Sequence, residues 1–177
     1  ETAPELVAVV PVAPVVPVIK APEKPIRKEG LNDGQKVAYE KAISFYNSDK
    51  KTFSIAGPAG SGKTFLVTSV INALRKANAG MEIVLSSPTH RANTVTRVKN
   101  PNDTVKTLHV LLGLKPNVDL SKFNAKDVQF SQGSELDDKF PNNALIIVDE
   151  SSMINDELYA FLMEKVNAAK GTKIIFL

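Results

Sequence analysis

Residues 57–64 read Gly57-Pro58-Ala59-Gly60-Ser61-Gly62-Lys63-Thr64. This octet matches the pattern Gly-x-x-x-x-Gly-Lys-(Ser/Thr) of a phosphate-binding loop. Its glycines let the backbone curl so that successive N–H groups point at phosphate oxygens, and Gly62 leaves room for close approach. Lys63 would place a cation at the β and γ oxygens, and Thr64 would offer its hydroxyl to Mg²⁺. The octet therefore predicts a site for a nucleoside triphosphate, with ATP and Mg²⁺ as the expected ligands.

The sequence on either side has the order that such a loop requires. Residues 52–56 predict a buried strand before the octet, and residues 65–76 predict a helix after it. The positive N-terminal end of that helix would point at the bound anion. Phe65, its first residue, joins the octet among the candidate nucleotide contacts. The alternative is a glycine turn between strand and helix that contains Lys-Thr by chance.

Two adjacent acids form the second half of the expected site. Residues 145–148 read Leu-Ile-Ile-Val, a continuous apolar run typical of a strand buried on both faces of a parallel sheet, and Asp149 and Glu150 follow at once. Ligands of open α/β sheets bind at the carboxyl ends of the strands. We expect Asp149 to hold Mg²⁺ through water and Glu150 to orient or deprotonate the attacking water. The alternative is a solvated turn or the cap of the next helix.

Composition agrees with one globular domain and argues against two classes of site. The 177 residues suit one domain, and 43% hydrophobic residues can supply its core. The net charge of +3 permits nucleic-acid binding through a local patch but does not by itself indicate it. With no cysteine and two histidines, the chain has no disulfide framework and no ordinary structural zinc site. The absence of cysteine fits a reducing compartment such as the cytoplasm.

Residues 1–30 differ from the rest of the chain. They hold six of the 11 prolines amid valine and alanine, which predicts an extended, polyproline-like tail or linker. Prolines break a membrane-spanning helix, and the acidic Glu1 and Glu5 do not suit a signal peptide. A chain that begins with glutamate also indicates that the natural start was trimmed or lies upstream.

Residues 31–177 predict one α/β domain with a mostly parallel sheet and helices on both faces. Asn32 and Gln35 form a capping box at the start of a helix that runs to about Tyr46, with apolar residues facing the core. Thr107 is expected to cap a short helix. The remaining expected elements are strands at 82–87, 104–106 and 173–177, helices at 108–112 and from Asp156, and an inserted hairpin at about 115–142. The apolar residues expected in the core of the first helix are Val37, Ala38, Ala42, Ile43 and Phe45, and those of the helix from Asp156 are Leu158, Phe161, Leu162 and Val166.

Five motifs in this order resemble those of superfamily 1 DNA helicases, most closely the RecD/Dda branch. They are Gln35, the octet, Ser87-Pro88-Thr89-His90-Arg91-Ala92, Thr107-Leu108-His109 and Asp149-Glu150-Ser151-Ser152-Met153. The resemblance covers about residues 31–177 and implies a RecA-like motor domain of the P-loop NTPase class. Members of the branch move 5′ to 3′ along single-stranded DNA, so the expected partners are single-stranded DNA, the DNA fork, and replication or repair proteins. The implied location is the cytoplasm of a bacterium or a phage-infected host.

The resemblance also implies roles for individual residues. In the family, a glutamine placed like Gln35 reads the adenine edge; the alternative is that Gln35 only closes the capping box, and the two roles are compatible. Pro88, Thr89 and His90 would grip the DNA backbone, and Arg91 and Arg97 are either phosphate contacts or solvated helix residues. Thr107 and His109 match a further DNA-contacting motif. The alternatives are a helix cap for Thr107 and a half-buried structural histidine for His109.

In this branch a small hairpin acts as a pin that separates the duplex. Phe130, on an alternating stretch at 128–132, is the candidate aromatic that stacks on the last base pair, and Phe123 is the second candidate. A lone phenylalanine is more often a core residue. Ser151, Ser152 and Met153 would link the nucleotide site to the rest of the motor, with packing under the sheet as the alternative for Met153.

The family continues beyond the strand at 173–177 with a second RecA-like domain that carries an arginine finger. Because such a finger accelerates turnover by roughly 10³ to 10⁵, the 177 residues are expected to bind Mg-ATP but hydrolyse it poorly. Two other functions stay open. A nucleotide or small-molecule kinase would show ATP consumption that depends on a phosphoacceptor, and a non-catalytic nucleotide- or DNA-binding module would show no hydrolysis.

Overall fold

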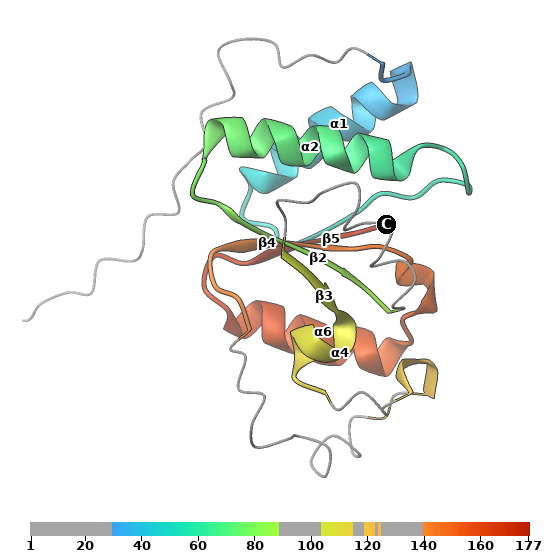
Figure 1. Cartoon of the computed structure of the whole chain (residues 1–177), viewed down its shortest axis with the longest axis vertical. Coiled ribbons are helices and arrows are strands. Elements are labelled where there is room, and N and C mark those ends of the chain that lie inside the picture. Colours follow the sequence, from blue (N-terminus) through green and yellow to red (C-terminus); the bar gives the residue numbers. More distant parts are fainter. Residues whose placement is uncertain (1–29, 89–103, 115–118, 123, 125–139) are drawn as a thin grey trace, which may run out of the picture.

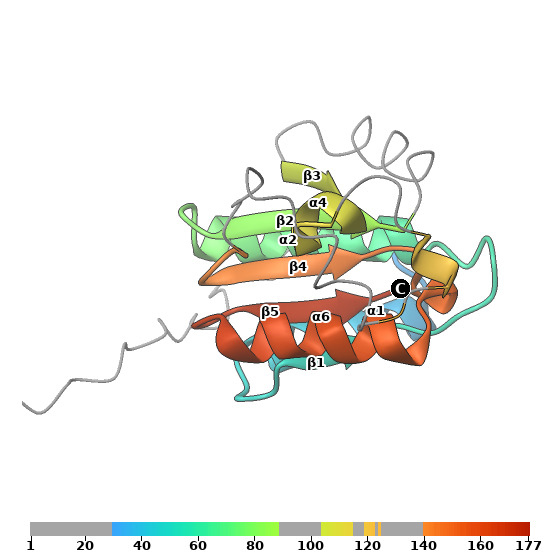
Figure 2. The same cartoon turned by 90° about the horizontal axis from the view of Figure 1, so that it is seen from below.

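The computed structural model describes residues 30–88, 104–114, 119–122, 124 and 140–177. Within these residues five strands form a single sheet in the order β1-β5-β4-β2-β3, and every neighbouring pair is parallel (Figure 1, Figure 2). The strands are β1 (Thr52–Ser54), β2 (Glu82–Ser87), β3 (Thr104–Thr107), β4 (Ala144–Val148) and β5 (Lys173–Phe176). The helices are α1 (Asp33–Tyr46), α2 (Lys63–Ala77), α4 (Leu108–Leu112) and α6 (Asp156–Ala168), with short 3₁₀ turns η1 (Leu120–Lys122) and η2 (Ser151–Met153).

Helices cover both faces of the sheet. In Figure 1, α1 and α2 lie above the sheet, and α4 and α6 lie below it. Each pair encloses its own apolar core against the strands: Ile83, Leu85 and Ile147 belong to the core under α1 and α2, whereas Val84 and Ile146 belong to the core over α4 and α6. This alternation along single strands follows from the two-residue period of a strand. The expected α/β fold with helices on both faces is confirmed.

Strand β4 occupies the centre of the sheet, between β5 and β2. All five of its residues are buried, which explains why its sequence is continuously apolar instead of alternating. Asp149 follows directly, and its backbone N–H donates to the Ser86 carbonyl of β2 at 2.9 Å. Asp149 and Glu150 therefore lie at the middle of the sheet edge that is formed by the carboxyl ends of the strands, called the carboxyl edge below.

A strand is present where residues 52–56 predicted one, but it is shorter, and the expectation that it is buried is wrong. Strand β1 has three residues, lies at the edge of the sheet beside β5, and is half-buried to exposed along its length. An edge strand has one neighbour, so its faces and its free edge remain partly open to water. Ile55, which follows β1, is buried and still donates its N–H to the Phe176 carbonyl at 2.8 Å.

Helix α1 begins with the predicted capping box. Asn32 Oδ1 accepts from the Gln35 N–H at 2.9 Å, and Gln35 Oε1 accepts from the Asn32 N–H at 3.0 Å. Ala42 and Phe45 are buried as expected, and Ala38 and Ile43 are partly buried. Val37 was expected in the core but is 52% exposed, because the inward stripe passes through Tyr39 instead.

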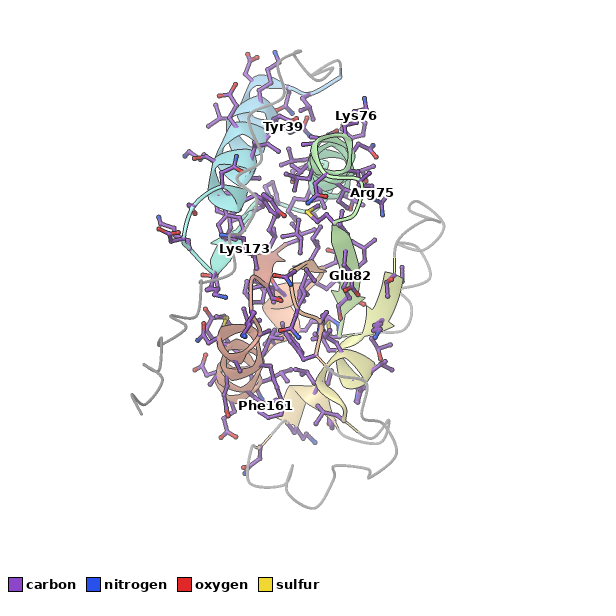
Figure 3. All side chains as sticks on the ribbon, turned by 90° about the vertical axis from the view of Figure 1, so that its left-hand side faces the viewer. Tyr39, Arg75, Lys76, Glu82, Phe161 and Lys173 are labelled. Atoms are coloured by element: carbon purple, nitrogen blue, oxygen red, sulfur yellow. The ribbon has the colours of Figure 1, made fainter. Side chains whose placement is uncertain are left out.

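Lys173, the first residue of β5, is a buried charged residue that no sequence pattern indicated. Its Nζ donates to the carbonyls of Ser48 and of Lys50, the latter at 2.7 Å, and lies 5.1 Å from the centre of the Phe45 ring. Figure 3 labels it beside the end of α1. Burial lowers the pKa of this ammonium, with a further lowering from Lys51. Lys173 thereby ties the connection between α1 and β1 to the sheet.

The later elements largely agree with the sequence. Thr107 caps α4 by accepting from the Val110 N–H at 3.3 Å. Leu158, Leu162 and Val166 of α6 are buried as expected, whereas Phe161 is only partly buried. Of the expected hairpin at 115–142, the structure describes a 3₁₀ turn at Leu120–Lys122 and an irregular approach to β4, while the stretch at 128–132 lies outside the described residues. Among the described helices, none is long and apolar enough to cross a bilayer.

Candidate functional site

The phosphate-binding octet forms the connection between Ile55 and α2. Gly60 and Gly62 have φ angles of 76° and 81°, a left-handed backbone conformation that residues other than glycine rarely adopt. At Gly57 the absence of a side chain matters for a different reason, since an added Cβ would lie 2.9 Å from Ser61 Oγ. The backbone conformation therefore requires glycine at positions 60 and 62, whereas at position 57 a side chain would displace the Ser61 hydroxyl.

Lys63 folds back over the loop that precedes it. Its Nζ donates to the Gly57 carbonyl at 2.7 Å and to the Pro58 carbonyl at 3.2 Å. An ammonium has three donors, so these contacts place its charge at the mouth of the loop and leave it able to bind an anion as well.

Helix α2 begins at Lys63, with Gly62 as its N-cap. Gly62 has no side chain with which to cap the helix, and the first N–H groups of a helix have no acceptor within it. The N-terminal end of α2 also carries the positive pole of the helix dipole. Loop and helix together thus present main-chain donors and a positive field at one place, which suits phosphate.

The acids reach the same place from the centre of the sheet. Asp149, Glu150 and Lys63 line one pocket of about 600 Å³ at the carboxyl edge. Asp149 is half-buried, and its Oδ1 accepts from the Glu150 N–H at 2.9 Å. Glu150 has φ 55°, a left-handed conformation that turns the chain sharply after β4. The other lining residues are Ser54, Ile55, Ala56, Gly57, Ala59, Ser151, Ser152 and Leu177.

This arrangement fits Mg²⁺ and a triphosphate. A Cβ at Gly57 would crowd the side chain of Ser61 and contact that of Lys63, and Lys63 lines the same pocket as the carboxylates of Asp149 and Glu150. Mg²⁺ in such sites takes one or two protein oxygens together with phosphate oxygens and water. Among the described residues, no group of three or more acidic, histidine or cysteine side chains could hold a metal ion.

Of the expected nucleotide contacts, Gly57, Ala59 and Lys63 line the pocket, whereas Phe65 does not, and neither do Pro58, Gly60, Ser61, Gly62 and Thr64. Phe65 is 50% exposed, and its ring lies beside Gly30, where an added Cβ would be 3.3 Å from Phe65 Cζ. Its role in nucleotide binding stays a prediction.

Ser151 joins the acidic turn to the end of β5, a contact that the sequence did not indicate. Its N–H and its Oγ both donate to the Leu177 carbonyl, at 2.9 Å and 2.6 Å. The two strand ends that line the pocket are therefore held together. Met153 does not pack under the sheet, the alternative considered from the sequence, because it is 49% exposed.

Gln35 contacts the octet as well as its own helix. Its Nε2 donates to the Ser61 carbonyl at 2.9 Å while its Oε1 serves the capping box. The capping-box interpretation is thus confirmed, and the adenine contact stays a prediction.

The candidate DNA contacts that the structure describes lie on the other half of the carboxyl edge. Ser87 of β2 pairs with Thr107 of β3, so Pro88 and the start of α4 emerge from adjacent strand ends. Thr107 is 8% exposed and serves as the cap of α4, which confirms the alternative role considered for it. His109 is half-buried. Thr89, His90, Arg91, Arg97, Phe123 and Phe130 lie outside the described residues.

Comparison with known proteins agrees with this geometry. A family model described as AAA domain matches residues 40–177. The chain is 30% identical over 138 residues to the "ATP-dependent DNA helicase dda" of Enterobacteria phage T4, covering 78% of this chain and 29% of that protein. It is 30% identical over 169 residues to the "RecBCD enzyme subunit RecD" of Buchnera aphidicola, covering 84% of this chain and 25% of that protein. An uncharacterized mimivirus protein is 27% identical over 150 residues.

The chain thus spans between a quarter and a third of the length of these relatives. The match to the family model includes the octet, the strand ends and the acids that form the pocket. The chain therefore belongs to the AAA domain family, as a P-loop motor domain of the superfamily 1 helicases in the RecD/Dda-like branch.

Proposed function

We propose that this chain binds Mg-ATP in the pocket between the octet and the acids, and serves as a motor domain of an ATP-dependent DNA helicase. The observation that carries the proposal is the convergence of Lys63, at the start of α2, and of Asp149 and Glu150, at the end of β4, on one pocket. A cation, a metal-binding carboxylate and a second carboxylate beside a glycine cradle are the groups that phosphoryl transfer to water needs.

Each residue has a distinct role in this proposal. Lys63 leaves the carbonyls of the loop and neutralises the β and γ oxygens. Thr64 and Asp149 hold Mg²⁺, which neutralises charge on the phosphates. Glu150 orients the attacking water and accepts its proton. The N–H groups of the octet fix the phosphates in line with that water.

The DNA track is proposed to run across the ends of β2 and β3. There Pro88, His109 and the segment from Thr89 to Arg91 would contact the backbone of one strand, next to a nucleotide site on the same sheet edge. Nucleotide-dependent changes at the acids then reach the DNA-binding residues through β4 and β2, which pair at five positions.

The names of the relatives support DNA as the substrate. Translocation 5′ to 3′, unwinding with Phe130 as a wedge, and a separate tail at residues 1–30 belong to the same proposal.

Binding of single-stranded DNA tests the second half of this proposal. The chain should raise the anisotropy of a fluorescein-labelled thymidine oligonucleotide, and the affinity should fall steadily as salt increases, because phosphate contacts release counterions. His109→Ala should weaken binding about threefold, the loss of one hydrogen bond of ordinary strength. Saturation at low salt with a duplex of equal length but not with the single strand would contradict the proposal, as would no anisotropy change with either.

A further inference from the structure

Gln35 stands at the contact between the start of α1 and the phosphate-binding octet. Its Nε2 donates to the Ser61 carbonyl at 2.9 Å in a partly buried bond that spans 26 residues of sequence. Its Oε1 accepts from the Asn32 N–H at 3.0 Å. The donor end and the acceptor end of this carboxamide therefore both bind main-chain groups.

The Ser61 carbonyl belongs to the last turn of the octet. The Ser61 N–H donates to the Pro58 carbonyl at 3.2 Å, and the next residue, Gly62, is the left-handed N-cap of α2. A Cβ on Gly62 would lie 2.5 Å from Gln35 Nε2, so the amide packs directly against this turn. Gln35 thus contacts the octet through one hydrogen bond and through close packing.

The direction of the Ser61 carbonyl decides the direction of a neighbouring donor. A trans peptide is planar, so its C=O and the following N–H point in opposite directions. Because Gln35 draws the Ser61 carbonyl toward α1, the Gly62 N–H must point away from α1. Phosphate-binding loops work only when successive N–H groups converge on one anion. The amide of Gln35 therefore controls the orientation of one member of that set.

We propose that Gln35 is a positioning residue for the phosphate-binding loop, which holds the Ser61–Gly62 peptide in its phosphate-binding orientation before any nucleotide arrives. This inference rests on the proposed triphosphate site. It differs from recognition of the adenine base, because it acts through the two main-chain bonds that the amide already makes, while a second N–H and a second lone pair stay available for a base edge. If Gln35 positions the loop, it affects the affinity for a polyphosphate that carries no base as well as the affinity for ATP.

Gln35→Met is the variant that tests this, because methionine keeps the length and helix propensity of the side chain and removes both amide bonds. Asn32→Ala is the matched control. It removes the other half of the same capping box, yet leaves the residue 32 N–H and the Ser61 carbonyl available to Gln35. Binding of Mg-tripolyphosphate and of Mg-ATP is measured by titration calorimetry. Amide hydrogen exchange of residues 57–63 is measured on the nucleotide-free protein.

Gln35→Met should weaken the binding of tripolyphosphate and of ATP by the same factor, about tenfold for the loss of the partly buried hydrogen bond to Ser61. It should also speed exchange at Gly62, while Asn32→Ala changes neither. Loss of ATP affinity alone, with tripolyphosphate binding and loop exchange unchanged, would show base recognition and overturn the inference. Equal effects of the two variants would attribute them to helix stability and overturn it as well. If the unmutated chain binds neither ligand, the proposed function fails, and loop exchange still decides the role of Gln35.

Discussion

Lys63→Ala is expected to lower the affinity of the chain for Mg-ATP by about a hundredfold or more. Hydrogen bonds to charged groups contribute ~1.5–3 kcal/mol each, and an ammonium at the β and γ oxygens makes at least two. The fold should persist, because the partners that the structure gives Lys63 Nζ are two carbonyls of the exposed octet. Titration calorimetry measures the affinity, and circular dichroism verifies the fold.

Lys76→Ala is the matched control for this prediction. Lys76 lies on the same helix, in its last turn, and is exposed (Figure 3). The substitution removes the same charge from the chain at the opposite end of α2. Equal losses of affinity in the two variants would mean that net charge, and not the position of Lys63 in the octet, governs binding.

Glu150→Gln is expected to leave the ATP affinity within about twofold and to slow hydrolysis by about 10² or more, the usual contribution of a general base. The amide keeps the size of the side chain and its place beside the pocket, but it cannot accept a proton from water. The rate is measured as a single turnover with the protein in excess over radiolabelled ATP.

Glu164→Gln, an exposed position on α6, makes the same chemical change away from the pocket and should leave the rate unchanged. A Glu150→Gln variant that hydrolyses ATP at the unmutated rate would remove Glu150 from the proposed mechanism. The site would then need another acceptor for the proton of the attacking water.

The elements around the site could be predicted because their signals are local. The octet specifies its own turn chemistry, and the run at residues 145–148 is apolar throughout because β4 has a helix layer on each face. Asn32 and Gln35 form their capping box within one helical turn. In each case the residues that interact are close in sequence, so a short pattern contains all the information.

Prediction from the sequence failed for features that depend on the order of the strands or on partners far away along the chain. The buried strand expected at residues 52–56 is an edge strand, and burial at an edge depends on which strands lie beside it. Lys173 is buried among carbonyls of the α1–β1 connection, more than 120 residues away in sequence. The bonds from Gln35 to Ser61 and from Ser151 to Leu177 each span 26 residues. A pattern of neighbouring residues does not indicate partners that lie so far away in the sequence.

Direct titration of the unmutated chain with ATP tests the central claim, that the octet and the acids form one Mg-dependent triphosphate site. We expect saturable binding of one ATP per chain in the presence of Mg²⁺, competition by tripolyphosphate, and a clear loss of affinity when EDTA removes the metal. Absence of saturable binding by folded protein, or binding that tripolyphosphate cannot displace, would contradict the account.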